Sequence, residues 1–241
     1  MRISPILPLV LFLTLIHLGC SKGDAPPPNH GIVYTAGHMK DGQHAGEQHG
    51  PDDSPDIDLE QISNKLSAMS TIDIFRYALD SQNQGKYAVA MAAYNIVLER
   101  DENYPDIYYH QGVLYRDMGM RDEAFSAFQK AVLRNPNSAV AYYNLGYAYR
   151  CKGLHSEAVA EYKKALALVP ENNARQRASI HYHMGFSYFA SGLVDDAIRE
   201  FSQALAYKPK DKAIHQKLGI AYTAKGWSDK AKIEFSYSDK K

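Results

Sequence analysis

Histidine is the residue type in this chain with the clearest potential for metal chemistry, and four histidines lie close together near the N-terminus. They are spaced eight, six and five residues apart, at His30, His38, His44 and His49. Imidazole nitrogens bind Zn²⁺, Cu²⁺ and Ni²⁺, but these spacings do not match a closed structural zinc site and no cysteine lies among them. The four residues are therefore weak candidates for metal binding, and the alternative is a polar linker that is rich in histidine.

The sequence carries no recognisable catalytic motif. No HExxH, Gly-x-Ser-x-Gly or phosphate-cradling loop is present. His181 and His183 are two residues apart, so on a helix they point to different faces and cannot form a metal-binding pair. We expect His181 and His215 to be partly buried structural residues. The sequence predicts a protein that is not an enzyme and has no cofactor.

The charge of the whole chain is balanced, with 27 basic and 27 acidic residues and a formal net charge of +0. A nucleic-acid-binding surface needs a basic stripe. The sequence therefore predicts no nucleic-acid partner.

Residues 1–19 are typical of a secretory signal peptide. Arg2 precedes an apolar run over 6–16, which is much shorter than the roughly 20 residues of a membrane-spanning helix. The run leads to Gly19-Cys20, which resembles the bacterial lipobox, although His17 stands where that motif usually has an apolar residue. The resemblance implies that Cys20 carries acyl chains such as palmitate. Because Ser21 and not aspartate follows, it further implies an outer-membrane lipoprotein facing the periplasm.

The next segment, 20–57, combines the lipidated N-terminus with a tether rich in His, Gly and Pro. It has few large apolar residues, so it cannot bury enough apolar area to offset its ordering entropy, and we expect a disordered spacer. Apolar residues then recur at helical spacing from Leu59 to Met69. This spacing predicts a short capping helix within 58–70.

A repeated pattern fills the rest of the chain. Five glycines are each followed, five residues later, by an alanine, and four residues after that by an aromatic residue. The glycines are Gly85, Gly119, Gly153, Gly192 and Gly226, spaced 34, 34, 39 and 34 residues apart. A fixed period of this size indicates stacked supersecondary units. The wider gap reflects five extra residues, 173–177, which predict a longer first helix in the fourth unit that protrudes from the edge.

The pattern resembles the tetratricopeptide repeat (TPR). The third unit carries the family's marker residues at Tyr142, Leu145, Gly146, Tyr149, Ala158, Tyr162, Ala165 and Pro170. The resemblance implies an all-α solenoid of five helix-turn-helix repeats over 71–241, in the units 71–104, 105–138, 139–172, 178–211 and 212–241. Within each unit we expect the repeated glycine to end the first helix. We expect Gly146 and its equivalents to let the backbone of the second helix approach closely.

The TPR resemblance also implies a concave groove that binds protein or peptide partners. Carried over to this sequence, its lining is aromatic with two arginines: Tyr109, Val113, Arg116, Tyr143, Tyr147, Arg150, Tyr182, Phe186 and Phe189. Tyrosine and arginine are favoured at binding hot spots.

The layout of the whole chain resembles bacterial TPR lipoproteins that serve envelope machines, such as pilotins and adaptors for proteases. It predicts a non-catalytic, membrane-anchored scaffold that binds protein partners in the cell envelope. Two alternatives remain open. One is a metal-handling protein that uses the histidine-rich tether, and the other is a self-assembling structural lipoprotein whose open C-terminal end pairs with another copy.

Overall fold

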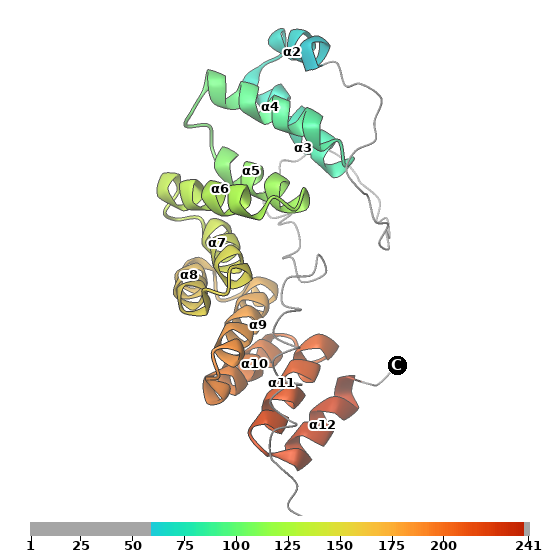
Figure 1. The fold of residues 1–241 in the computed structure, drawn as a ribbon, viewed down its shortest axis with the longest axis vertical. Coiled ribbons are helices and arrows are strands. Elements are labelled where there is room, and N and C mark those ends of the chain that lie inside the picture. Colours follow the sequence, from blue (N-terminus) through green and yellow to red (C-terminus); the bar gives the residue numbers. More distant parts are fainter. Residues whose placement is uncertain (1–58, 239–241) are drawn as a thin grey trace, which may run out of the picture. The chain divides into compact units, whose positions relative to one another are not determined.

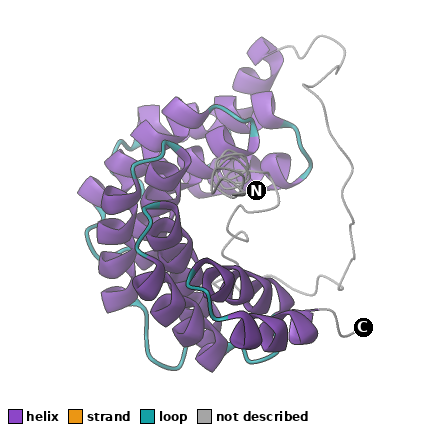
Figure 2. Ribbon diagram, turned by 60° about the horizontal axis from the view of Figure 1, so that its bottom comes forward, coloured by secondary structure: helices purple, strands orange, loops and turns teal. Residues whose placement is uncertain are grey.

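The computed structural model describes residues 59–238, and within this range it contains 11 helices and no strand (Figures 1 and 2). Several predicted features lie outside the described residues. They are the signal peptide 1–19, the lipidation site Cys20, the tether 20–57, and the four tether histidines.

One short helix precedes five helix pairs. The short helix is α2 (Leu59–Ser67). We name the first helix of each pair the A helix and the second the B helix. The A helices are α3 (Thr71–Asn83), α5 (Ile107–Asp117), α7 (Ala139–Cys151), α9 (Ala174–Ala190) and α11 (Lys212–Ala224). The B helices are α4 (Tyr87–Arg100), α6 (Arg121–Arg134), α8 (His155–Leu168), α10 (Val194–Tyr207) and α12 (Ser228–Ser238). The all-α helix-pair fold predicted from the repeat is confirmed.

The turn within each pair is made by the repeated glycine, as the sequence predicted. All five of these glycines have φ between 74° and 80°, the left-handed region that residues with a Cβ rarely adopt. Most A helices begin with a polar side chain that accepts a hydrogen bond from the first turn: Ser70, Ser138, Asn173 and Asp211. Local residues therefore define both ends of most A helices.

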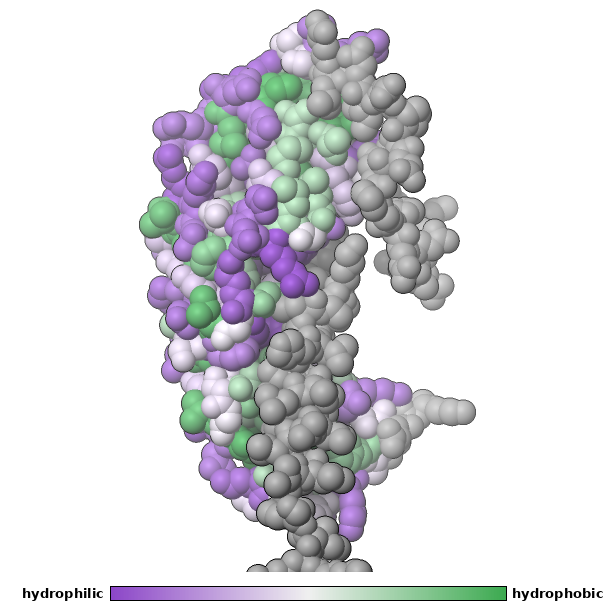
Figure 3. All heavy atoms as spheres, in the orientation of Figure 1, coloured by the Kyte–Doolittle hydropathy of each residue, from purple (hydrophilic) through white to green (hydrophobic). Residues whose placement is uncertain are grey.

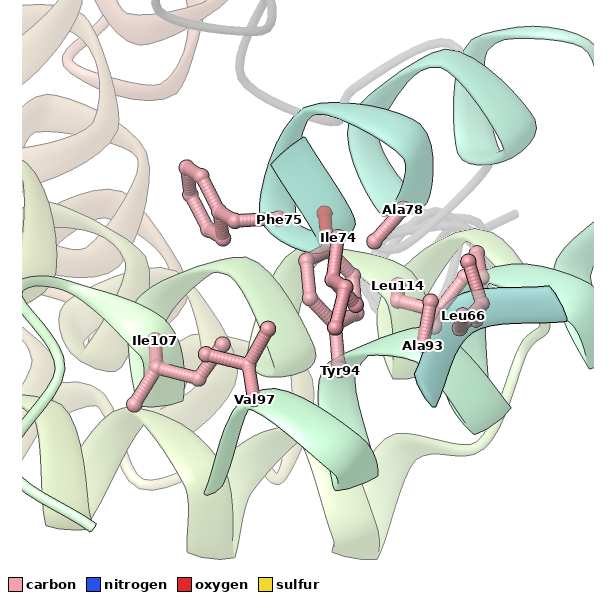
Figure 4. Close-up of a cluster of buried hydrophobic side chains, with 10 residues drawn as sticks. Leu66, Ile74, Phe75, Ala78, Ala93, Tyr94, Val97, Ile107 and Leu114 are labelled. Atoms are coloured by element: carbon pink, nitrogen blue, oxygen red, sulfur yellow. The ribbon is translucent and has the colours of Figure 1, made fainter. Parts of the chain in front are cut away.

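The helices fall into two compact units, 59–136 and 137–238, and each is described by itself. In the first unit, α2, α3, α4 and α5 contribute to one apolar cluster (Figure 4). Leu66 of α2, Ile74 of α3 and Tyr94 of α4 are fully buried in it. Because Leu66 has no exposed surface, the short helix α2 is part of this core.

The second unit has two apolar clusters, one where α7, α8 and α9 meet and one where α9, α10 and α11 meet. Tyr162 of α8 and Phe201 of α10 are the large buried residues of the two clusters, with exposed fractions of 0% and 1%. These aromatics lie on the glycines of the preceding A helices. A Cβ built on Gly146 would lie 2.8 Å from two Tyr162 ring atoms, and one built on Gly185 would lie 2.8 Å from Phe201.

This contact extends the expectation for Gly146. The sequence predicted that the glycine lets the backbone of the B helix approach closely, and the structure adds the aromatic ring to that contact. The atoms nearest to a Cβ built on Gly146 are those of the Tyr162 ring, and the backbone carbonyl oxygen of Ala158 follows at 3.1 Å. The glycine therefore makes room mainly for the ring.

The five extra residues lengthen helix α9, as predicted. This helix has 17 residues, against 13 in α7 and α11, and Asn173 caps it. The last of the five, Arg177, is packed and does not protrude. Its Nη1 donates to the carbonyl of Val169 at 2.9 Å, and its Nε donates to the Tyr207 hydroxyl at 2.9 Å.

Candidate protein-binding face of the A helices

The predicted groove residues belong to two different units, and three of them lie on α5 in the first unit. Tyr109 and Val113 are buried, with exposed fractions of 8% and 7%. Arg116 donates to the carboxylate of its neighbour Asp117, from Nη2 at 3.0 Å and from Nε at 3.2 Å. The other oxygen of that carboxylate accepts from Gln82 at 3.0 Å. The charge of Arg116 is therefore balanced on its own helix.

The other six predicted residues lie on α7 and α9 in the second unit. The three on α7 are buried: Tyr143, Tyr147 and Arg150. The three on α9 are half-buried: Tyr182, Phe186 and Phe189. The structure thus divides the predicted set into an inner row and an outer row, and the outer row offers more surface to a ligand.

Arg150 joins the two rows. Its guanidinium carbon lies 4.8 Å from the ring centroid of Tyr147 and 4.7 Å from that of Phe186. A cation within about 6 Å of an aromatic face is attracted by the ring quadrupole. The planar guanidinium of arginine can also stack on the ring. A second cation, Lys217 of α11, places its Nζ 5.7 Å from the Phe186 centroid. Phe186 therefore contacts cations from both neighbouring A helices.

His183 of α9 is buried against the rings of Tyr147 and Tyr182. It was not among the predicted site residues. It is surrounded by tyrosine rings and stacks on Tyr162 with centroids 6.0 Å apart and planes 21° apart. Burial lowers the pKa of His183 well below its usual value, and the nearby positive charge of Arg150 lowers this pKa further. The imidazole is therefore neutral at pH 7 and belongs to the core.

The same arrangement occurs around His110 in the first unit. His110 stacks on Tyr94 with centroids 6.3 Å apart, and its ring lies at 80° to that of Phe75 with centroids 5.0 Å apart. Both histidines stand sixth in their repeat units, 105–138 and 178–211. This shared position was the signal in the sequence that could have identified them as a pair.

His181 and His215 are the satisfied structural histidines that the sequence predicted. Nδ1 of His181 lies 2.8 Å from Oε2 of Glu200, and Nδ1 of His215 lies 2.6 Å from Oε2 of Glu234. Each pair joins an A helix to the B helix of the same repeat. These histidines hold helices together and are not aimed at a ligand.

Other functional features are not found in the part of the chain that the structure describes. Residues 59–238 contain no cluster of three or more His, Cys, Asp or Glu side chains that could hold a metal ion. No helix in this range is both long enough and apolar enough to cross a bilayer. Large exposed apolar residues are scattered, and the visible face in Figure 3 shows hydrophobic patches among hydrophilic ones.

Comparison with known proteins agrees with this geometry. Residues 105–171 match a family model described as tetratricopeptide repeat. A crystal structure of MamA protein is 28% identical, with a TM-score of 0.63, and the match covers 70% of this chain and 89% of that one. A second MamA crystal structure is 29% identical, with a TM-score of 0.61, covering 67% of this chain and 91% of that one.

A MamA structure from Desulfovibrio magneticus RS-1 is similar in fold, with a TM-score of 0.64 at 20% identity over 71% of this chain and 95% of that one. The comparison with curated proteins gives no significant match. The repeat match, the structural neighbours, the five helix pairs and the glycine turns agree with one another. Together they show that the chain is a tetratricopeptide-repeat protein.

Proposed function

We propose that this chain is a non-catalytic scaffold that is anchored to a bacterial membrane by lipid and binds protein partners through its A helices. The observation that carries the proposal is the half-buried aromatic row on α9, at Tyr182, Phe186 and Phe189, within a TPR fold. Such rings offer large apolar area at low cost in side-chain entropy, which suits a peptide laid across the A helices. TPR scaffolds are generally non-enzymatic, and we extend this to the present chain.

The binding test is site-specific photo-crosslinking in the native cell. A photoreactive amino acid at Phe189 should capture a discrete protein, because this side chain is half-buried on the proposed face. The matched control places the same amino acid at Ala160, an exposed residue of the B helix α8. Capture of the same proteins at both positions would contradict a binding face on the A helices.

The membrane anchor is a separate part of the proposal and rests on the lipobox resemblance at Cys20. Acyl chains add about 0.8 kcal/mol for each buried CH₂, so two or more chains hold a protein stably on a bilayer. We propose the outer membrane, facing the periplasm, as the site of anchoring. This would keep the repeats close to envelope assemblies.

A disulfide bond and lipid attachment are alternative fates of a cysteine sulfur. The chain has two cysteines, and Cys151 is disulfide-bonded in the structure. A sulfur in a thioether to lipid cannot also form a disulfide. The anchor therefore predicts that Cys151 is a thiol in the lipidated protein.

Labelling with a fatty-acid analogue in the native cell tests the anchor. Cys20→Ser should abolish labelling and release the protein from membranes, whereas Cys151→Ser should leave both unchanged. Labelling that persists in Cys20→Ser would contradict the anchor. A wild-type protein with no label and no free thiol would favour the disulfide.

Self-association is a second candidate function, favoured by the exposed apolar residues of the last helix pair. Trp227, Ile233 and Tyr237 are exposed by 41%, 55% and 46%. No further A helix follows α12 within the described residues to cover them. Light scattering across a concentration series tests this candidate. A growing mass that Ile233→Glu abolishes would favour self-assembly, and a constant monomer mass would contradict it.

A further inference from the structure

The A helices of the second unit carry charged side chains of one sign only. Helices α7, α9 and α11 contain no Asp or Glu, but they contain five basic residues: Arg150, Arg175, Arg177, Lys212 and Lys217. The carboxylates of residues 137–238 all lie on the B helices or in the loops between helices. The layer that the TPR fold uses for partners is therefore basic and aromatic in this unit, even though the whole chain is neutral.

Two of these cations meet on one ring. The guanidinium of Arg150 lies 4.7 Å from the Phe186 centroid, and Nζ of Lys217 lies 5.7 Å from it. Arg150 is 4% exposed, so its charge acts from a poorly hydrated position. Lys217 is half-buried, and it forms no ion pair with any described residue. A ligand that reaches Phe186 thus meets an accessible ammonium group with a buried guanidinium beside the same ring.

In the first unit, a carboxylate follows the arginine at the corresponding repeat position. Arg116 occupies the same repeat position as Arg150, the twelfth, and its positive charge is balanced by Asp117 on its own helix. The residue after Arg150 is Cys151, which supplies no such carboxylate. The two units therefore differ in the charge that their A helices carry, although they share one repeat pattern.

We infer that the face of α7, α9 and α11 binds an acidic peptide segment, in which an Asp or Glu carboxylate lies against Lys217 beside Phe186. A neighbouring apolar side chain of the peptide packs on the half-buried ring of Phe189. This inference rests on the proposed protein-binding function and adds the charge of the partner. Charge complementarity selects the occupant, since a basic segment would place like charges together beside Arg150 and Lys217.

The test measures binding of a synthetic peptide library to the full chain. The library holds 12-residue peptides with Glu, Gln or Lys at two central positions and mixed aromatic and aliphatic neighbours. We expect Glu peptides to dominate the bound set and their affinity to fall as salt is raised. Lys217→Glu should weaken these peptides by about tenfold or more, because it replaces attraction by repulsion.

Lys212→Glu is the matched control, since it makes the same charge change on the same helix at an exposed position. It should leave the selected peptides bound within about twofold, because surface charges screened by salt interact weakly. Circular dichroism and thermal melting of both variants establish that the repeats remain folded. Phe186→Leu keeps an apolar side chain but removes the aromatic ring, and it should weaken the same Glu peptides.

The possible outcomes separate this inference from the function on which it rests. Peptides bound without a preference for Glu would overturn the acidic partner, and equal weakening by the two lysine substitutions would overturn the contact with Lys217. Both outcomes would leave peptide binding intact. No bound peptide of any class would contradict the proposed function as well. Binding of phosphatidylglycerol vesicles that needs Lys217, in the absence of a Glu preference, would also overturn the inference.

Discussion

The ring of Tyr162 lies directly on Gly146, so close that a Cβ at Gly146 would come within 2.8 Å of two ring atoms. We predict that Gly146→Ala lowers the free energy of unfolding by about 1–2 kcal/mol. Overpacking costs about 1–3 kcal/mol, and the better helix propensity of alanine returns up to about 1 kcal/mol of this. Urea denaturation followed by circular dichroism measures the change.

A double-mutant cycle with Tyr162→Leu supplies the control. The smaller side chain removes the ring atoms that the new Cβ would meet, so Gly146→Ala should become neutral or stabilising in that background. An equal loss in both backgrounds would show that the glycine serves another purpose than admitting the ring.

The alanine of the same contact gives a second prediction. Ala158 has no exposed surface, and its carbonyl oxygen faces Gly146. Ala158→Leu should therefore overpack the α7–α8 contact and lower the free energy of unfolding by about 1–3 kcal/mol. Ala160→Leu, on the exposed side of the same helix, should change it by less than about 0.5 kcal/mol. An unchanged melting temperature for Ala158→Leu would contradict the helix-pair register.

The contrast between Gly146 and Arg150 shows what the sequence could and could not predict. The helix pairs and the glycine turns follow from local chemistry that repeats at a fixed period, so reading one unit is enough to place the others. The environment of Arg150 depends on Phe186 from the next A helix. Periodicity gives the position of that ring along its own helix, but the side-chain packing that buries Arg150 is a tertiary property. The burial of His183 among tyrosines was missed for the same reason.

The half-buried imidazole of His110 predicts a pH dependence of stability. Burial lowers the pKa of His110 to about 4, a shift that the nearby Asp106 carboxylate only partly opposes. The usual pKa of histidine, about 6.5, applies to the unfolded chain. Between these two values the unfolded state binds more protons than the folded state, so stability decreases as the pH falls from about 6.5 to about 4. The contribution of His110 to this decrease is about 3 kcal/mol.

His110→Asn isolates this contribution, because asparagine is the residue that the third unit carries at the equivalent position, Asn144. Denaturation of both proteins at pH 7 and pH 4 should show a smaller loss in the variant, by about 3 kcal/mol. Parallel losses in the two proteins would mean that His110 does not carry this part of the pH dependence.

The buried pair of His181 and Glu200 predicts that replacing His181 lowers the free energy of unfolding. Both residues are 8% exposed, and Nδ1 of His181 lies 2.8 Å from the carboxylate. His181→Leu leaves this buried carboxylate with Arg199, at 3.8 Å, as a weaker partner. It should cost about 1–3 kcal/mol in the free energy of unfolding. The exposed ion pair of Asp229 and Lys232 is the control, where Asp229→Asn should change it by at most about 0.5 kcal/mol.

Arg100 gives the last prediction, because its guanidinium donates hydrogen bonds to carbonyl groups at the C-terminal end of helix α2 and just beyond it. It donates to the carbonyl oxygen of Met69 at 2.6 Å and to that of Ser67 at 2.9 Å. The last carbonyls of a helix have no partner within the helix, so a cation placed there stabilises its end. In Arg100→Ala, amide hydrogen exchange should become faster in α2 while that of α3 and α4 stays within about twofold, because local opening of α2 costs less free energy. Faster exchange throughout residues 59–136 would instead mean that α2 unfolds together with the whole first unit.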